Sequence, residues 1–246
     1  MRLTVCLTEL NGLSAMLSLI RRRMLESERL PAGYQEVEYI KNNSTSGGLD
    51  TGMKMSITDY SIEAKFKQDE VSNGMPLGMF NANAGALRYY SYLYANNNKF
   101  AIYADFTDRW NVSKMLWTPL NTDIHIVRFE GHPTSCDISW DNGNTVTGTY
   151  TTPQQYSTDN LFVFDRGATI NPYLGRIYYV KLWNTETGAM LFNYVPCVRK
   201  SDDTPGFYDL VSNEFKTIIA AKTKWEAGPI IVDYLCFTAL EDGKFT

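Results

Sequence analysis

Cysteine and histidine are scarce in this sequence. Its 246 residues include four cysteines, at positions 6, 136, 197 and 236, and two histidines, His125 and His132. The cysteines form no CxxC pair and match neither a zinc knuckle nor a dense disulfide framework, so we expect free and mostly buried thiols. Two histidines without a serine or cysteine nucleophile motif predict neither a metal site nor a hydrolase triad. We expect His125 to pack on a strand and His132 to lie in a turn.

An excess of positive charge is also missing. The formal net charge is -4 and the isoelectric point is near 5.3. Proteins that hold phosphate backbones instead cluster lysine and arginine on one face. We therefore expect no nucleic-acid partner.

Long hydrophobic runs are absent as well. An apolar stretch near the start, residues 13–20, is short and leads directly into Arg21, Arg22 and Arg23. A secretory signal would place the positive charge first and small residues last, and a membrane helix needs about 20 apolar residues. The sequence therefore predicts neither an N-terminal signal peptide nor a membrane span.

Aromatic residues and alternating patterns are what the sequence has. Aromatics make up 13% of the chain, led by 16 tyrosines and 12 phenylalanines. Ile62, Ala64 and Phe66 alternate with polar residues, which is typical of a strand with one wet face. Many such short segments without interleaved helices predict an all-β, antiparallel sandwich.

Turn signals divide the alternating segments into hairpins. Residues 88–94 and 99–106 flank three asparagines, and Asn142-Gly143 supplies the backbone of a tight turn after a predicted strand at 136–140. Residues 173–183 are predicted to pair with 190–195 across Thr187-Gly188.

The two ends differ from the middle. Residues 1–29 are predicted to contain a short helix, from about Leu13 to Glu28, which ends at Pro31. This segment either packs on its own domain or attaches it to a partner or to copies of itself. Residues 30–229 form the predicted β domain. Residues 230–246 are predicted to be a terminal strand or a linker.

A series of short elements carries a family resemblance. They are Leu30 to Ile40, Asp50-Thr51-Gly52, Asn160 to Phe164, Gly175 to Trp183, Pro196 to Lys200, Gly206 to Phe215 and Ala227-Gly228-Pro229. In order and spacing they resemble the concanavalin A-like (laminin G-like) jelly-roll domains found in phage structural and tail proteins and in surface proteins of gut bacteria.

The resemblance implies two curved antiparallel sheets packed face to face. In carbohydrate-binding relatives, sugars lie on the concave sheet or on loops at its rim, whereas other members dock proteins or fill space. We expect a non-catalytic recognition module that binds a glycan or a cell-surface receptor, on a virion or a bacterial cell surface. A structural or decoration protein that binds only other proteins is the alternative, and a glycoside hydrolase is a remote one.

The predicted ligand site is a group of aromatic and polar residues. Sugar sites combine an aromatic platform with groups that hydrogen-bond hydroxyls. Tyr90 and Tyr92 lie on one face of a predicted strand, and Arg109 and Trp110 follow in the sequence. We predict that these four residues bind the ligand.

Several acidic residues are candidates for catalysis or for calcium binding. Glu63 and the Asp69-Glu70 pair depart from the alternating acidic signature of related glucanases, so we expect no enzyme activity. Asp105 with Asp108, or Asp137 with Asp141 and Asn142, could bind calcium, but such residues are usually turn formers. We therefore predict no cofactor and leave calcium open.

Overall fold

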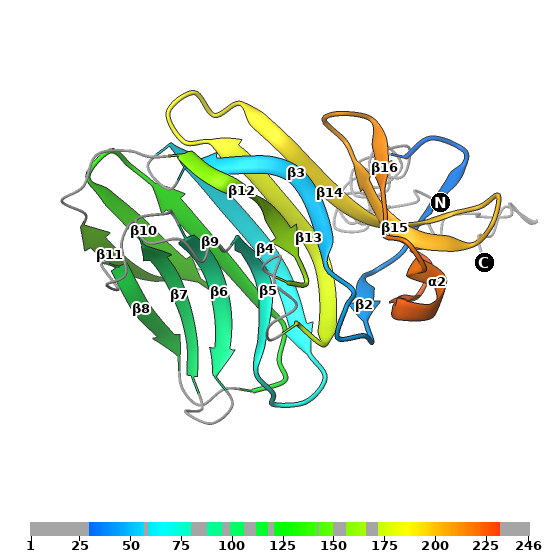
Figure 1. Cartoon of the computed structure of the whole chain (residues 1–246), viewed down its shortest axis with the longest axis horizontal. Coiled ribbons are helices and arrows are strands. Elements are labelled where there is room, and N and C mark those ends of the chain that lie inside the picture. The colour runs from blue at the N-terminus through cyan, green and yellow to red at the C-terminus, as the bar shows by residue number, and fades with distance from the viewer. Residues whose placement is uncertain are drawn as a thin grey trace, which may run out of the picture.

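The computed structural model describes the β domain and leaves both ends of the chain aside. The described residues are 30–56, 59–79, 88–94, 99–105, 112–117, 121–141, 143–149, 156–165 and 172–231. The predicted N-terminal helix, and most of the predicted C-terminal segment, lie outside them. The structure is an antiparallel β-sandwich, which confirms the predicted fold class (Figure 1).

The larger sheet has eleven strands. Eight of them follow one path, in the order β11 (Asn144–Thr149), β10 (Ser135–Trp140), β9 (His125–Gly131), β4 (Tyr60–Gln68), β13 (Gly175–Asn184), β14 (Met190–Arg199), β15 (Thr204–Asp209) and β16 (Glu214–Lys216). Three short strands pair beside this path: β1 (Tyr34–Glu36) with β14, β2 (Ile40–Asn42) with β13, and β17 (Trp225–Ala227) with β2.

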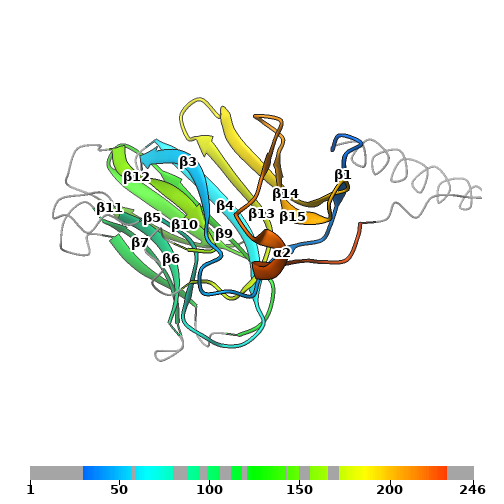
Figure 2. The same cartoon turned by 45° about the vertical axis from the view of Figure 1, so that its right-hand side comes forward.

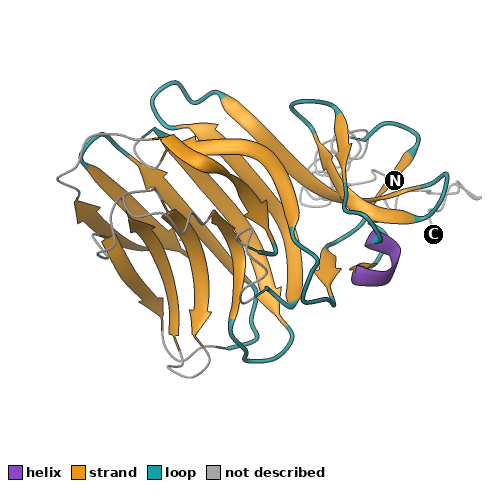
Figure 3. Ribbon diagram, in the orientation of Figure 1, coloured by secondary structure: helices purple, strands orange, loops and turns teal. Residues whose placement is uncertain are grey.

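The smaller sheet has six strands. Their order is β3 (Leu49–Ser56), β12 (Tyr156–Val163), β5 (Gly74–Met79), β6 (Arg88–Tyr94), β7 (Lys99–Asp105) and β8 (Val112–Trp117). Neighbouring strands in both sheets are antiparallel. Strands therefore dominate the view in Figure 3, and α2 (Ala221–Lys224) is the helix of the described part.

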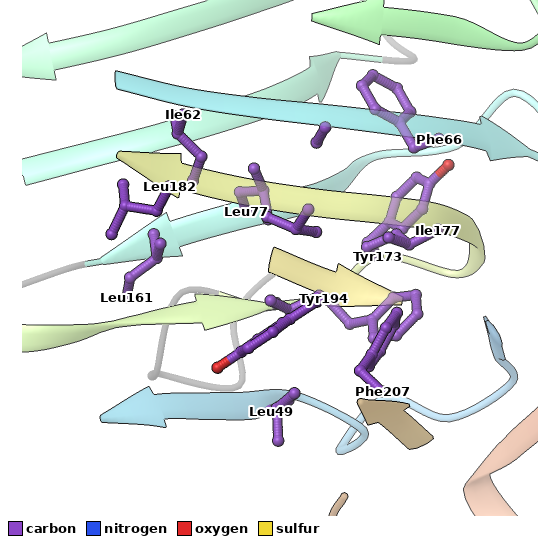
Figure 4. Packing of buried hydrophobic residues seen from close by; sticks show 14 of the residues in the cluster. Leu49, Ile62, Phe66, Leu77, Leu161, Tyr173, Ile177, Leu182, Tyr194 and Phe207 are labelled. Carbon is purple, nitrogen blue, oxygen red and sulfur yellow. The ribbon is translucent and has the colours of Figure 1, made fainter. Parts of the chain in front are cut away.

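The core lies between the two sheets, where side chains of both inner faces meet (Figure 4). Ile62 and Phe66 of β4 are buried, as their alternation predicted, and they share the core with Leu77 of β5 and Leu161 of β12. Each fully buried side chain of this size stabilises the fold by about 1.5–3 kcal/mol. The same alternation leaves the intervening residues of β4 on the outer side of the larger sheet.

To one side of the smaller sheet, β14 and β15 continue into an extension that carries β1, β16 and α2 (Figure 1, Figure 2), and Phe207 of β15 and Ala221 of α2 still belong to the core. The two described ends of the chain meet there. Val37 forms a bridge with Ile230, and the Ile231 amide donates to the Glu36 carbonyl over 3.1 Å. Of the predicted terminal strand, this bridge is the part that the structure describes.

Most of the predicted hairpins are confirmed. They correspond to β6 with β7, β10 with β11, and β13 with β14. Cys136 and Cys197 are free and buried, as expected, and burial raises the pKa of the Cys197 thiol to about 12. Within the described residues, no helix is both long and apolar enough to cross a membrane.

Candidate binding face

The outer side of the larger sheet carries a group of aromatic and charged side chains that can meet a ligand. Alternation on β4 places Glu63, Lys65 and Lys67 on this side, because Ile62, Ala64 and Phe66 face the core. We call this surface, built on β4, β9, β10 and β13, the outer face.

Arg128 and Trp183 form the central contact of the outer face. The Arg128 guanidinium lies 4.8 Å from the centre of the Trp183 ring. Its Nη2 atom lies 3.3 Å from Oε2 of Glu130, and the side chains of Arg128 and Glu130 are 40% and 34% exposed. Strand register explains the meeting, since Trp183 and Glu130 both pair with Ser61, from opposite sides of β4.

Hydroxyl and carboxylate groups surround this contact. The Ser61 and Thr185 hydroxyls share a hydrogen bond of 2.7 Å. On the next strand, Asp137 pairs with Glu130 across β9 and β10, accepts from the Thr147 hydroxyl over 2.6 Å, and lies 3.6 Å from His132 Nε2. His132 lies in the turn between β9 and β10, as predicted, and its side chain is therefore close to Asp137.

Three further cations lie over aromatic rings toward the other end of β13. Lys181 is 4.6 Å from the centre of the Tyr179 ring, Lys65 is 5.1 Å from that of Tyr178, and Arg176 is 4.7 Å from that of Tyr39. The Tyr39 and Tyr178 rings meet edge to face at 5.5 Å. With the Arg128–Trp183 pair, four cation–aromatic contacts follow β13.

The carboxylates that lie among these cations raise the pKa values of neighbouring groups. Lys181 lies 3.7 Å from Glu63. Burial raises the pKa of the Tyr179 hydroxyl well above its usual value, and Glu63, which accepts a hydrogen bond from it, adds to the rise. Asp69 lies 2.8 Å from Lys41 and 2.9 Å from Arg176, and its hydrogen bond raises the pKa of Lys41.

Two of the four predicted ligand residues lie on the other sheet. Tyr90 and Tyr92 are on β6 of the smaller sheet, where Tyr90 is opposite Gly78 and Tyr103 and Tyr92 is opposite Ala101. Their side chains lie outside the described part of the structure, as do Arg109 and Trp110 entirely. A site formed by these four residues therefore stays a prediction.

The acids considered for catalysis do not form a pair. Glu63 lies on the wet face of β4, as expected, whereas Asp69 follows the end of that strand and is held by Lys41 and Arg176. Six residues of strand separate them by about 20 Å, whereas a retaining glycosidase needs its two carboxyl groups about 5 Å apart.

The acids considered for calcium have different partners. Asp137 accepts from Thr147 on the outer face. Asp141, which follows β10, has different partners. Its Oδ2 atom lies 2.7 Å from Nδ1 of His125, and its Oδ1 atom accepts a hydrogen bond of 3.0 Å from the Ile126 amide. His125 is buried, and its ring centre is 6.4 Å from that of Phe66, so it packs on its strand as predicted. No group of three or more metal-binding side chains occurs among the described residues.

Sequence reasoning did not single out Trp183 and Arg128 as candidate site residues. A usable signal was present, because Tyr179, Lys181 and Trp183 recur at every second position and so lie on one face of their strand. Arg128 and Glu130 show the same spacing on β9. What the sequence did not show is that β4 brings these two strands together.

Comparison with known proteins identifies the fold. No protein-family model matches the sequence, and no curated protein sequence does. The native heptameric SAP-like pentraxin from Limulus polyphemus superposes with a TM-score of 0.52 at 9% identity, over 82% of this chain and 98% of the pentraxin. The chain has the concanavalin A-like jelly-roll fold.

Other solved structures of the concanavalin A-like fold are similar to this chain. Domains LG4-5 of the mouse laminin alpha1 chain match with a TM-score of 0.49 at 15% identity, over 63% of this chain and 44% of the laminin fragment. The CBM40 module of the Ruminococcus gnavus IT-sialidase matches with a TM-score of 0.41 at 12% identity, over 61% of this chain and 90% of the module. The chain thus spans less than half of the laminin fragment.

Proposed function

We propose that this protein is a non-catalytic recognition module that binds carbohydrate on the outer face of the larger sheet. The observation that carries the proposal is the half-exposed Arg128 side chain, whose guanidinium is held 4.8 Å from the Trp183 ring and beside Glu130. A ring of this size meets the C–H faces of a pyranose, while a guanidinium and a carboxylate hydrogen-bond its hydroxyls. The contact therefore offers both parts of a sugar site.

The local hydrogen bonds favour binding over chemistry. Glu130 and Asp137 are directly opposite one another, but each already has other partners, Arg128 for Glu130 and Thr147 with His132 for Asp137. Groups fixed in this way are suited to holding hydroxyls in place. This supports a module without catalytic activity.

The position of the chain ends supports display on a larger assembly. β1, next to the described N-terminal end, pairs with Cys197–Arg199 of β14, whereas Trp183 pairs with Met190 at the other end of that strand. Seven residues of strand separate the two points, up to about 23 Å. A chain mounted through its N-terminal segment would leave the binding residues accessible.

We place the assembly on a phage particle or a bacterial surface, because the sequence elements resemble domains found there. Many weak sites on one particle gain effective concentration, so modest affinity per copy suffices.

A structural role with only protein partners is the alternative, and exposed apolar residues favour it. Ile219, in the loop between β16 and α2, is 94% exposed, and Ile230 and Ile231 at the described C-terminal end are 57% and 45% exposed. Such side chains are typical of protein contacts when they form a patch.

A glycan array probed with the protein in oligomeric form tests the proposal. Selective binding is expected, and Trp183→Ala should weaken it about tenfold, because stacking and the position of Arg128 are lost together. Trp183→Phe, which keeps a ring, serves as the control and should retain most of the binding. An array that stays blank at every valency would favour the structural alternative.

A further inference from the structure

We propose that the ligand is an acidic glycan, whose carboxylate or sulfate groups bind Lys65, Lys67 and Arg176 at one end of the outer face. The inference rests on the proposed function and adds the class of sugar. It starts from an uneven distribution of charge over a surface that is otherwise rich in aromatic residues.

The pairing of strands places four cationic side chains close together. Lys67 of β4 is directly opposite Arg176 of β13, which is opposite Lys41 of β2. Lys65 lies two positions from Lys67 on the same face, about 6.7 Å along the strand, and is opposite Tyr179. Four cations from three adjacent strands therefore occupy one area, which we call the basic end.

Three carboxylates partly balance the four cations of the basic end: Asp69, Glu226 and Glu38, whose charge helps to raise the pKa of Tyr178 after the larger effect of burial. Asp69 is shared by Lys41, at 2.8 Å, and Arg176, at 2.9 Å. Glu226 is opposite Lys41 at the edge of the area and accepts from Asn43 over 3.2 Å. Among the described residues, Lys65 and Lys67 form no ion pair. The whole chain has a formal net charge of -4, so the positive charge of the basic end is opposite in sign to the net charge of the protein.

Tyrosine rings hold two of the cations in place. Lys65 lies over Tyr178 and Arg176 over Tyr39, at 5.1 and 4.7 Å from the ring centres. These two rings contact each other edge to face at 5.5 Å. Cations positioned in advance lose less conformational entropy when an anion binds them, which favours a specific ligand.

The opposite end of the face argues against a uniformly charged polymer. Around Trp183 the surface carries Glu130 and Asp137 in direct opposition, and these would repel a continuous phosphate backbone. A glycan can place an acidic sugar on the basic end and a neutral sugar on Trp183. Arg176 and Trp183 are seven residues apart on β13, roughly 20 Å, which an oligosaccharide can span.

Titrations of the full chain with defined polymers test the inference. The probes are hyaluronate and kappa-carrageenan, in which a carboxylated or sulfated sugar alternates with a neutral one, and the neutral polymer dextran, each at low and at moderate salt. We expect at least one acidic polymer to bind at least tenfold more tightly than dextran, with an affinity that falls as salt rises.

Two variants locate the binding. Lys65→Gln with Lys67→Gln should weaken binding of the acidic polymer about fivefold or more and lower the melting temperature only slightly, because the contact of Lys65 with the Tyr178 ring is lost but neither lysine has an ion pair with another described residue. Lys54→Gln is the matched control, since Lys54 is an exposed lysine of β3 in the smaller sheet, and it should have no effect.

Each other outcome overturns a distinct claim. If dextran binds as well as the acidic polymers, or if the double variant binds normally, the acidic ligand is wrong while the proposed function stands. If single-stranded DNA and poly-glutamate bind as tightly as the acidic glycans, the surface responds to charge alone and the inference fails. If neither these polymers nor the glycan array give binding, the proposed function fails as well.

Discussion

Among the described residues, Asp202 is a carboxylate whose charged form is strongly favoured by its neighbours. Its carboxylate lies 2.9 Å from Nε and 2.8 Å from Nη2 of Arg199, and it accepts from the Thr204 hydroxyl over 2.7 Å. The Arg199 hydrogen bonds, followed by those of Thr204, hold the pKa of Asp202 well below its usual range. Because the folded state favours the charged form, this group stabilises the protein above the ordinary pKa of an aspartate, about 4.

We therefore expect part of the stability to disappear as the pH falls below about 4 and on through the lowered pKa of Asp202. Asp202→Asn should lower the urea midpoint at pH 7, and this difference should shrink toward pH 2. Denaturation curves at several pH values, at low and high salt, measure it, and salt should weaken the effect because the pair is exposed. A difference that stays constant with pH would show that the charge is not responsible.

The sequence element from Gly206 to Phe215 has a structural explanation. A Cβ atom on Gly206 would lie 2.6 Å from the Lys216 carbonyl oxygen and from the Phe215 ring, so the two strands approach too closely for a side chain there. In the turn between β15 and β16, Asp209 accepts from the Asn193 and Val211 amides and from the Ser212 hydroxyl. This element, one of several that carry the family resemblance, thus fixes the close pairing of β15 with β16, and its Phe207 is buried in the core.

A hydrogen-bond network joins the ends of β9, β10 and β4. The Asp141 carboxylate lies 2.7 Å from Nδ1 of His125 and accepts a hydrogen bond of 3.0 Å from the Ile126 amide. On the other side of the imidazole ring, Asn121 Oδ1 lies 2.7 Å from His125 Nε2. The side-chain amide of Gln68 completes the network by donating to the Asn121 carbonyl over 2.7 Å. Asp141 also has a left-handed backbone, with φ of 46°.

Asp141→Ala should destabilise the protein by about 1.5–3 kcal/mol, since it removes both acceptors and places alanine in a left-handed conformation. Asp141→Asn should lose less, because asparagine tolerates this backbone and can still accept from the Ile126 amide. Urea denaturation compares the two variants. Equal losses would show that neither the backbone nor the amide contact contributes.

At the scale of elements, alternation and turn residues were sufficient to predict most strands. Ile62 and Phe66 identified the inner face of β4, and Asn142-Gly143 identified the hairpin of β10 and β11. The order of strands in the sheet was beyond that reasoning, because pairing between distant segments depends on the packing of the whole core. Trp183 and Arg128 contact each other because β4 pairs with β13 on one side and with β9 on the other. For this reason the sequence predicted a ligand site from residues that are close together along the chain. The candidate site on the larger sheet, which combines residues of distant segments, was not predicted.

At the scale of the molecule, the N-terminal segment is expected to attach the domain to partners or to further copies. We expect the full chain to form particles of more copies in solution than a chain that starts at Leu30, which keeps every residue of the described core. Light scattering of both chains gives the number of copies per particle. The same number for both, with no binding to a particle component by either chain, would mean that the segment packs on its own domain.

The most direct test of the central claim compares the two sheets as binding surfaces. Isothermal titration with the strongest glycan from the array would use the wild type, Trp183→Ala on the larger sheet and Trp110→Ala, the aromatic residue that the sequence favoured. The account predicts that Trp183→Ala weakens binding about tenfold, equivalent to about 1.4 kcal/mol, and that Trp110→Ala leaves it nearly unchanged. Loss of binding in Trp110→Ala with full binding in Trp183→Ala would contradict it.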